Sequence, residues 1–320
     1  MDIMTSSPTP GSSPRRPAPA AARSAQRAQP TQRTQPAQPT QLALAGMPRR
    51  LFSCTPSKLL AYADCPRRYR FTYVDRPAPP KGPAWAHNSL GASVHNALRS
   101  WWDQDQPART PERAAHLLRR GWLQDGWRDA EQSRTWRERA AEMVGRYTAE
   151  LDPAAEPVGL ERTVAARTER LALSGRIDRL DEVGGELVVV DYKTSRRPPE
   201  PVDARASLAL AVYAVAAAST LRRPCRRVEL HHLPTGSRVA AEHDEASLAR
   251  HIRRAESLAD DIERSTEELR SGADPDRAFA ATPGPLCSWC DYRGVCPTGQ
   301  AAAPPLAPWH SLEPTAERPA

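Results

Sequence analysis

Apolar and polar residues follow a helical period over much of the segment from residue 58 to residue 151. In the segment Ser133–Leu151, the apolar residues at positions 136, 140, 143, 144, 147 and 151 form one face of a helix. Helix-start signals such as Thr110-Pro111-Glu112, with proline at the first helical position, separate this helix from its neighbours. The pattern predicts helices over residues 58–65, 67–74, 90–102, 110–122 and 133–151.

The pattern changes in the second half of the chain, where short apolar segments predict strands over 158–166, 171–180 and 187–192. An Ala-rich buried helix (207–218), a hairpin (228–233 and 238–242) and a long charged helix (245–270) follow. Leu187–Val190 is a continuous apolar run, which is typical of a strand buried on both faces. This order of elements predicts an α/β domain with a mixed sheet.

Two aspartates and a lysine meet if Gly184-Gly185 forms a two-residue hairpin turn, which glycine favours because it accepts positive φ. Residues whose numbers sum to 369 then pair, so Asp178 faces Asp191, and Lys193 projects on the same side as Asp191. Such a patch suits a divalent metal held against a phosphate. The alternative is an exposed hairpin whose charged side chains lie on its solvent-exposed face and have no special role. A charged tripeptide at the end of a buried strand favours the metal, because it needs partners or a function.

Composition divides the chain into a folded region and two tails. The first 48 residues are mainly Pro, Ala, Gln, Thr, Ser and Arg, and such a segment buries too little surface to offset its chain entropy. We therefore expect a disordered basic tail over 1–48, one domain over 51–300 and a frayed Pro-rich tail over 304–320. The net charge of +7 does not mark the domain as a nucleic-acid binder, because residues 1–50 contribute +6 of it.

The chain contains no apolar window long enough for a membrane span and no apolar core of a signal peptide near its N-terminus. We expect a cytoplasmic protein whose six cysteines do not form structural disulfides.

Three of these cysteines form a compact C-x2-C-x5-C pattern at Cys287, Cys290 and Cys296. Thiolates this close can share one metal ion or cluster, but the triplet lacks a fourth ligand of its own. A distant cysteine is the simplest completion: Cys65 is preferred, Cys54 is an alternative, and a third candidate, less favoured, is Cys225. Four thiolates suit zinc and an iron–sulfur cluster equally, and free thiols in a reduced protein are the remaining alternative.

Taken in order, these motifs resemble the RecB-type branch of the PD-(D/E)XK nucleases, in particular its iron–sulfur members. The resemblance rests on Cys-Pro-Arg-Arg-Tyr from Cys65, Gly-x-x-x-His ending at His95, Gly-Arg-Ile-Asp ending at Asp178, Val-Val-Asp-Tyr-Lys-Thr around Asp191, and the cysteine triplet. It covers about residues 54–297 and extends to AddB-type nuclease domains and CRISPR-associated exonucleases. It implies a restriction-endonuclease-like mixed sheet flanked by helices, with the two ends of the domain joined by a four-cysteine cluster.

The resemblance also implies roles for individual residues. Asp178 and Asp191 would bind metal, Lys193 would be the catalytic lysine, and His95 would be a further metal ligand. One or two Mg²⁺ or Mn²⁺ ions would be held by these groups and the Tyr192 carbonyl. A 4Fe–4S cluster, with zinc less favoured, would be held by Cys65, Cys287, Cys290 and Cys296. Accessory roles fall to Glu161 and to Tyr213, although helix packing is the stronger interpretation of Tyr213.

One departure from the family pattern affects the expected activity. The family's Gln-x-x-x-Tyr helix has Ala209 at the glutamine position, which puts full activity in question. The leading hypothesis is a metal-dependent DNA nuclease, an exonuclease on single-stranded ends that serves repair or recombination. The alternatives are a weak or inactive DNA-binding subunit of a helicase–nuclease complex and a zinc-containing interaction module. No Gly-x4-Gly-Lys-Ser/Thr loop occurs, so ATP-driven unwinding would require a separate helicase.

Overall fold

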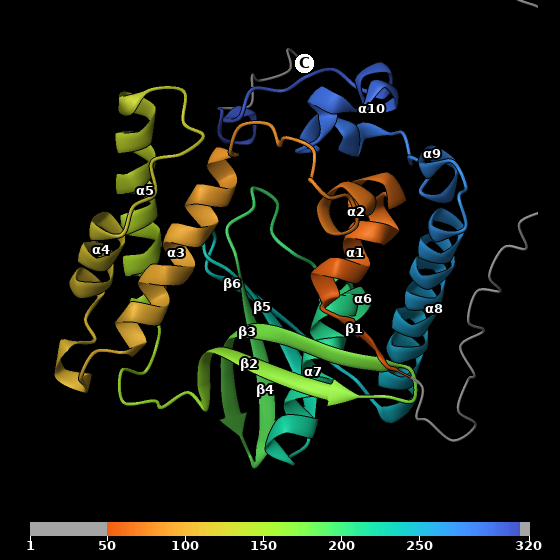
Figure 1. The fold of residues 1–320 in the computed structure, drawn as a ribbon. Helices are drawn as coiled ribbons and strands as arrows, with labels where there is room; N and C mark the ends of the chain where they lie inside the picture. The colour runs from red at the N-terminus through yellow and green to blue at the C-terminus, as the bar shows by residue number, and fades with distance from the viewer. Residues whose placement is uncertain (1–49, 314–320) are drawn as a thin grey trace, which may run out of the picture. The chain divides into compact units, whose positions relative to one another are not determined.

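A six-stranded mixed sheet forms the centre of the computed structural model, which describes residues 50–313 (Figure 1). The strand order is β1-β3-β4-β5-β6, and β2 also pairs with β3. β1 runs parallel to β3 and β4 parallel to β5, whereas the other pairs are antiparallel. The strands are β1 (Phe52–Cys54), β2 (Gly159–Arg167), β3 (Leu171–Val183), β4 (Glu186–Lys193), β5 (Cys225–His232) and β6 (Ser237–Glu242).

Helices cover both faces of this sheet, as Figure 1 shows. One group packs Leu and Ala side chains of α1, α7 and α8 against β3 and β4, and the other packs α3, α4 and α5 against the opposite side of β4. The helices are α1 (Pro56–Asp64), α2 (Pro66–Tyr73), α3 (Ala86–Trp102), α4 (Pro111–Arg120), α5 (Ala130–Ala149), α6 (Pro201–Ala206), α7 (Leu208–Leu221), α8 (Glu245–Arg270), α9 (Pro275–Ala278) and α10 (Pro297–Ala302).

The continuous apolar run of β4 reflects this double covering. Leu187 and Val189 belong to the core under α7, whereas Val188 and Val190 belong to the core under α3 and α5. Because successive side chains of a strand point to opposite faces, a strand covered on both sides must be apolar at every position. The α/β prediction with a mixed sheet flanked by helices is confirmed.

The β3–β4 hairpin has the predicted register. Gly184 and Gly185 both have positive φ, 60° and 87°, and the partners Arg179 and Val190 confirm the sum of 369. β3 is longer than its partners, so β1 pairs with its start at Leu171–Leu173 and β4 pairs with its end at residues 179–183. The stretch between them lacks a strand partner on that edge within the described residues, and Asp178 lies at its end.

The structure adds elements that the pattern did not predict. The three-residue β1 and the six-residue α6 were not expected, and α3 begins at Ala86 rather than Leu90. The Pro-rich segment after 304 was expected to fray, but it packs as far as Glu313: Leu312 is buried in the core under α3. The predicted tail over 1–48 and residues 314–320 lie outside the described residues. Within the described part of the chain, no helix combines the length and apolarity needed to cross a bilayer.

Candidate functional site

Three neighbouring strands place a row of carboxylates across the sheet. Glu161 on β2 lies opposite Asp178 on β3, as the flanking pairs 160↔179 and 162↔177 show. The hairpin register places Asp178 opposite Asp191, at the point where β3 and β4 diverge. There the Asp178 carboxylate, instead of a backbone carbonyl, accepts a hydrogen bond from the Tyr192 N–H at 3.0 Å. Carboxylates so close repel one another unless a cation lies among them.

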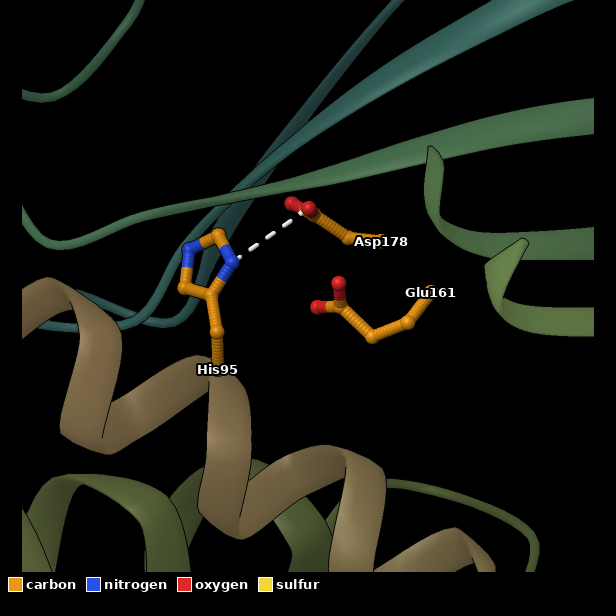
Figure 2. A group of neighbouring side chains, drawn as sticks. All are labelled: His95, Glu161 and Asp178. Atoms are coloured by element: carbon orange, nitrogen blue, oxygen red, sulfur yellow. Dashed lines mark ion pairs between the residues drawn. The ribbon is translucent and has the colours of Figure 1, made fainter. Parts of the chain in front are cut away.

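His95 on α3 points toward two members of this row, Asp178 and Glu161, as Figure 2 shows. Its Nδ1 lies 3.3 Å from Asp178 Oδ1, and its Nε2 donates to the Tyr192 carbonyl at 3.2 Å. One ligand atom each from His95, Glu161 and Asp178 lies within 4.8 Å of the others, so these side chains could hold a metal ion. Burial alone would lower the pKa of His95, but the hydrogen bond and charge of Asp178 outweigh it and raise the pKa.

Glu161 is more central than the sequence suggested. Its side chain is mostly buried and pairs with the exposed Arg176, whose Nε lies 2.8 Å from Oε2. Its backbone has φ 45°, a left-handed conformation that costs a non-glycine residue about 1–3 kcal/mol. Counting the β2–β3 register would have identified Glu161 as the partner of Asp178, but no glycine turn fixes that register in the sequence.

Asp191 and Lys193 form a close pair at the end of β4. Lys193 Nζ lies 2.6 Å from Asp191 Oδ2, and Asp191 is outside the set formed by His95, Glu161 and Asp178. Burial raises the pKa of the Asp191 carboxyl and the charge of Asp178 adds to this rise, whereas Lys193 opposes it. Lys193 lies between two hollows: one of about 570 Å³ contains the His95 set, and one of about 360 Å³ contains Asp191.

Tyr213 on α7 covers the glycine of the Gly-Arg-Ile-Asp motif. A Cβ added at Gly175 would lie 2.3 Å from Tyr213 Cε1, so only glycine allows the ring to lie so close to β3. Burial, together with the charges of Asp191 and Asp178, raises the pKa of Tyr213 to about 12. Tyr213 is therefore a packed, protonated phenol beside the carboxylate row. Ala209, one turn earlier on α7, lines the hollow of Asp191.

This contact predicts the effect of Gly175→Ala. The added methyl group overlaps the Tyr213 ring, and such overpacking is expected to lower the free energy of unfolding by about 1–3 kcal/mol. Chemical denaturation measures the loss, and Gly284→Ala is the control because a Cβ there meets nothing within 4 Å. In a Tyr213→Ala background the cost of Gly175→Ala is expected to disappear. An unchanged cost in that background would contradict the contact.

The structure brings together four cysteines from distant parts of the sequence. Cys65, Cys287, Cys290 and Cys296 all line one cavity of about 40 Å³. Backbone N–H groups point at two of the sulfurs: Thr282 donates to Cys65 Sγ at 3.4 Å, and Gly299 donates to Cys296 Sγ at 3.3 Å. All four are free thiols rather than disulfides.

The other two cysteines lie in the main core of the sheet. Cys54 and Cys225 are buried among its Leu and Val side chains. Burial raises the pKa of Cys54 to about 11 and that of Cys225 to about 12, so neither forms a thiolate readily. Four tryptophans of the helical region are packing residues: Trp101, Trp102 and Trp122 are buried, and Trp127 stacks on Trp122.

Comparison with known proteins supplies the family. A family model described as the PD-(D/E)XK nuclease superfamily matches residues 53–297, whereas no curated protein matches the chain. Among solved structures, the chain is similar to a protein from Eubacterium rectale described as a candidate exonuclease, with 10% sequence identity and a TM-score of 0.40. This likeness covers 66% of this chain and 79% of the other, and it is too distant to support a function. Because the family model spans well over half of its length, the chain belongs to the PD-(D/E)XK nuclease superfamily.

Proposed function

We propose that this protein is a metal-dependent DNA nuclease of the RecB type that hydrolyses phosphodiester bonds at single-stranded ends during repair or recombination. The observation that carries the proposal is the carboxylate row of Glu161, Asp178 and Asp191, with His95 above it and Lys193 beside it. Nucleases of this superfamily generally use divalent metal ions, and the row offers the oxygen ligands that Mg²⁺ and Mn²⁺ prefer.

The residues present fit such a cation. Asp178 Oδ1, the Glu161 carboxylate and a ring nitrogen of His95 converge, and the Asp191 Oδ2 atom is buried with Lys193 as its partner but no well-aligned hydrogen bond. Asp191 and the Tyr192 carbonyl would complete the set. A bound cation would lower the pKa of water and draw charge from a phosphate oxygen.

The chain's own groups would position and stabilise the reacting phosphodiester. The Lys193 ammonium, about half exposed and held by Asp191, faces the hollow in which the phosphate would lie and would stabilise the charge that develops there. Arg176 lines the same hollow and would supply a second positive charge. His95 is fixed by Asp178 on one ring nitrogen and by Tyr192 on the other, which orients the ring over the row.

The test is hydrolysis of end-labelled single-stranded DNA with Mn²⁺ or Mg²⁺. RNA, duplex DNA and circular single-stranded DNA are tested separately as alternative substrates. Mononucleotide products from linear DNA and resistance of the circle are expected of an exonuclease. Absence of any hydrolysis with either metal would refute the catalytic proposal. The chain has no ATP-binding loop, so a helicase partner would be a separate protein.

Ala209 favours one alternative, a weak or inactive DNA-binding subunit. It lines the hollow beside Asp191 and Lys193, where the resemblance implies a glutamine. About 360 Å³ is available there, enough for the longer side chain. If the natural chain is a weak enzyme, Ala209→Gln is expected to raise the rate of DNA hydrolysis about tenfold. Activity seen only in Ala209→Gln would favour the subunit, whereas full activity of the natural chain would favour the nuclease. The control is Ala149→Gln, at an exposed position of α5.

We further propose that the four cysteines hold a 4Fe–4S cluster, which would place the protein in the iron–sulfur branch. All four line one cavity, and backbone N–H groups donate to two of the four sulfurs. Zinc held by the same four thiolates is the alternative.

A further inference from the structure

A second charged hollow lies beside the candidate active site, on the other side of α6. It measures about 1070 Å³, and α6, β5 and the first turns of α8 contribute to its walls. α6 and the residue after it separate the two sites: Asp203 and Ser207 line the hollow of Asp191, whereas Arg205 lines the larger one. A chain that leaves the active site across α6 would therefore enter this hollow. Its basic lining consists of Arg205, Arg226, His243, Arg250, His251 and Arg254.

Four arginines and three carboxylates line this hollow, so positive charge exceeds negative charge by one. Arg205, Arg250 and Arg254 make no ion pair with any carboxylate of the described residues. Two of the three acidic residues in the lining already have partners: Glu242 pairs with Arg227 at 3.6 Å, and Asp244 caps α8 by accepting from the Ser247 N–H at 2.7 Å. The N-terminus of the 26-residue α8 adds the partial positive charge of a helix end.

His243 supplies a separate observation that points to a ligand. His243 is among the residues that line the hollow and is only 1% exposed, and its buried Nε2 atom has no hydrogen-bond partner. The other ring nitrogen, Nδ1, is 2.9 Å from the Ser247 hydroxyl. If that hydroxyl donates to Nδ1, the ring carries its proton on Nε2. A buried donor without an acceptor is costly, and an anionic oxygen would satisfy it.

We propose that this hollow binds the phosphate backbone of a polynucleotide, at a distance from the bond that is hydrolysed. Arginine forks and an imidazole N–H bind phosphate oxygens, whichever molecule carries them. The hollow is too large for one phosphate, and its charges are spread over three elements, which fits several successive phosphates rather than a free mononucleotide. The inference rests on the proposed function in one respect, because the bound strand would be the substrate.

The test compares two double variants of α8 in the full-length protein. Binding is measured with a mild chelator of divalent cations present, so that the DNA is not hydrolysed during the measurement. Arg250→Ala/Arg254→Ala removes charge from the hollow. Arg253→Ala/Arg264→Ala removes the same charge from exposed positions of the same helix outside it. Binding of labelled single strands of about 30 and about 6 nucleotides is measured by fluorescence anisotropy over a range of salt concentrations.

The hollow variant is expected to bind the long strand about tenfold more weakly. The magnitude of the slope of the log association constant against the log salt concentration should decrease by about 1.4, because two phosphate contacts on a single strand are lost. The control variant and the short strand should be nearly unaffected. The proposal would be overturned if both double variants lost the same affinity, if the long and short strands lost the same affinity, or if no affinity were lost. The proposal would also be overturned if the protein bound a labelled mononucleotide and the hollow variant abolished this binding.

The outcomes separate this proposal from the nuclease itself. Hydrolysis of the short strand, restored with Mn²⁺, tests the carboxylate row and should not change in the hollow variant. Length-dependent binding without any hydrolysis would refute the nuclease and leave the phosphate site standing. Hydrolysis of the short strand, together with unaltered binding of the long strand by the hollow variant, would support the nuclease and refute the phosphate site.

Discussion

Replacing Asp191 by asparagine is expected to lower the rate of DNA hydrolysis by about a thousandfold. The substitution removes one negative charge from the carboxylate row and the partner that holds Lys193 Nζ at 2.6 Å. A metal ion contributes several kcal/mol to stabilising the transition state, and each 1.4 kcal/mol corresponds to a factor of about ten in rate. Lys193→Ala is expected to lower the rate about a hundredfold, because it removes a single positive donor.

Metal binding distinguishes the roles within this site. Glu161→Gln and Asp178→Asn are expected to weaken Mn²⁺ binding measured by calorimetry, since both carboxylates belong to the set that could hold the ion. Lys193→Ala is expected to leave Mn²⁺ binding intact or to strengthen it. Asp105→Asn and Lys81→Ala, which change exposed residues remote from the row, serve as controls. Normal hydrolysis by Asp191→Asn, or unaltered Mn²⁺ binding by both Glu161→Gln and Asp178→Asn, would contradict the assignment.

Replacing Cys290 by alanine is expected to remove the brown chromophore and the bound iron, and to lower the melting temperature by about 10 °C or more. Cys65 precedes α2, whereas the other three cysteines follow α9, so a cluster would tie together segments more than 200 residues apart. The loss of a structural metal group costs at least about 4 kcal/mol, and each kcal/mol corresponds to roughly 2–4 °C in a domain of this size.

The measurements are visible absorbance, iron and sulfide assays, and a thermal melt on anaerobically purified protein. Cys54→Ala and Cys225→Ala are the controls, because both thiols lie in the sheet core and away from the cavity. These controls are expected to keep the chromophore. Zinc in place of iron in the natural chain, or iron retained by Cys290→Ala, would contradict the cluster.

Much of the fold follows from short-range patterns. The Gly184-Gly185 turn set the β3–β4 register, and the bounds of α8 agree with the predicted 245–270 because Asp244 caps it and charged residues mark its solvent face. β1 escaped prediction because three residues are too few to show a period, and its pairing with β3 depends on a contact more than 100 residues away. α6 is similarly short and is held by its capping box at Glu200 and Asp203.

The site was predicted only in part, for geometric reasons. The hairpin register brought Asp178 and Asp191 together, but it could not show that the Asp191 carboxylate turns to Lys193 while Glu161 takes the place beside His95. The proximity of His95 depends on how α3 packs on the sheet, which local patterns do not encode. Likewise, the sequence offered three candidates for the fourth cysteine, and only the folded chain distinguishes Cys65 from the two in the core.

The cysteine cavity has a consequence for biosynthesis. Its first sulfur comes from residue 65 and its last from residue 296, so almost the entire domain must leave the ribosome before the cavity can close. A nascent or truncated chain that ends before Cys287 presents one thiol of the four. Premature termination would therefore yield a product without this closure, even though every residue of the carboxylate row had already been translated.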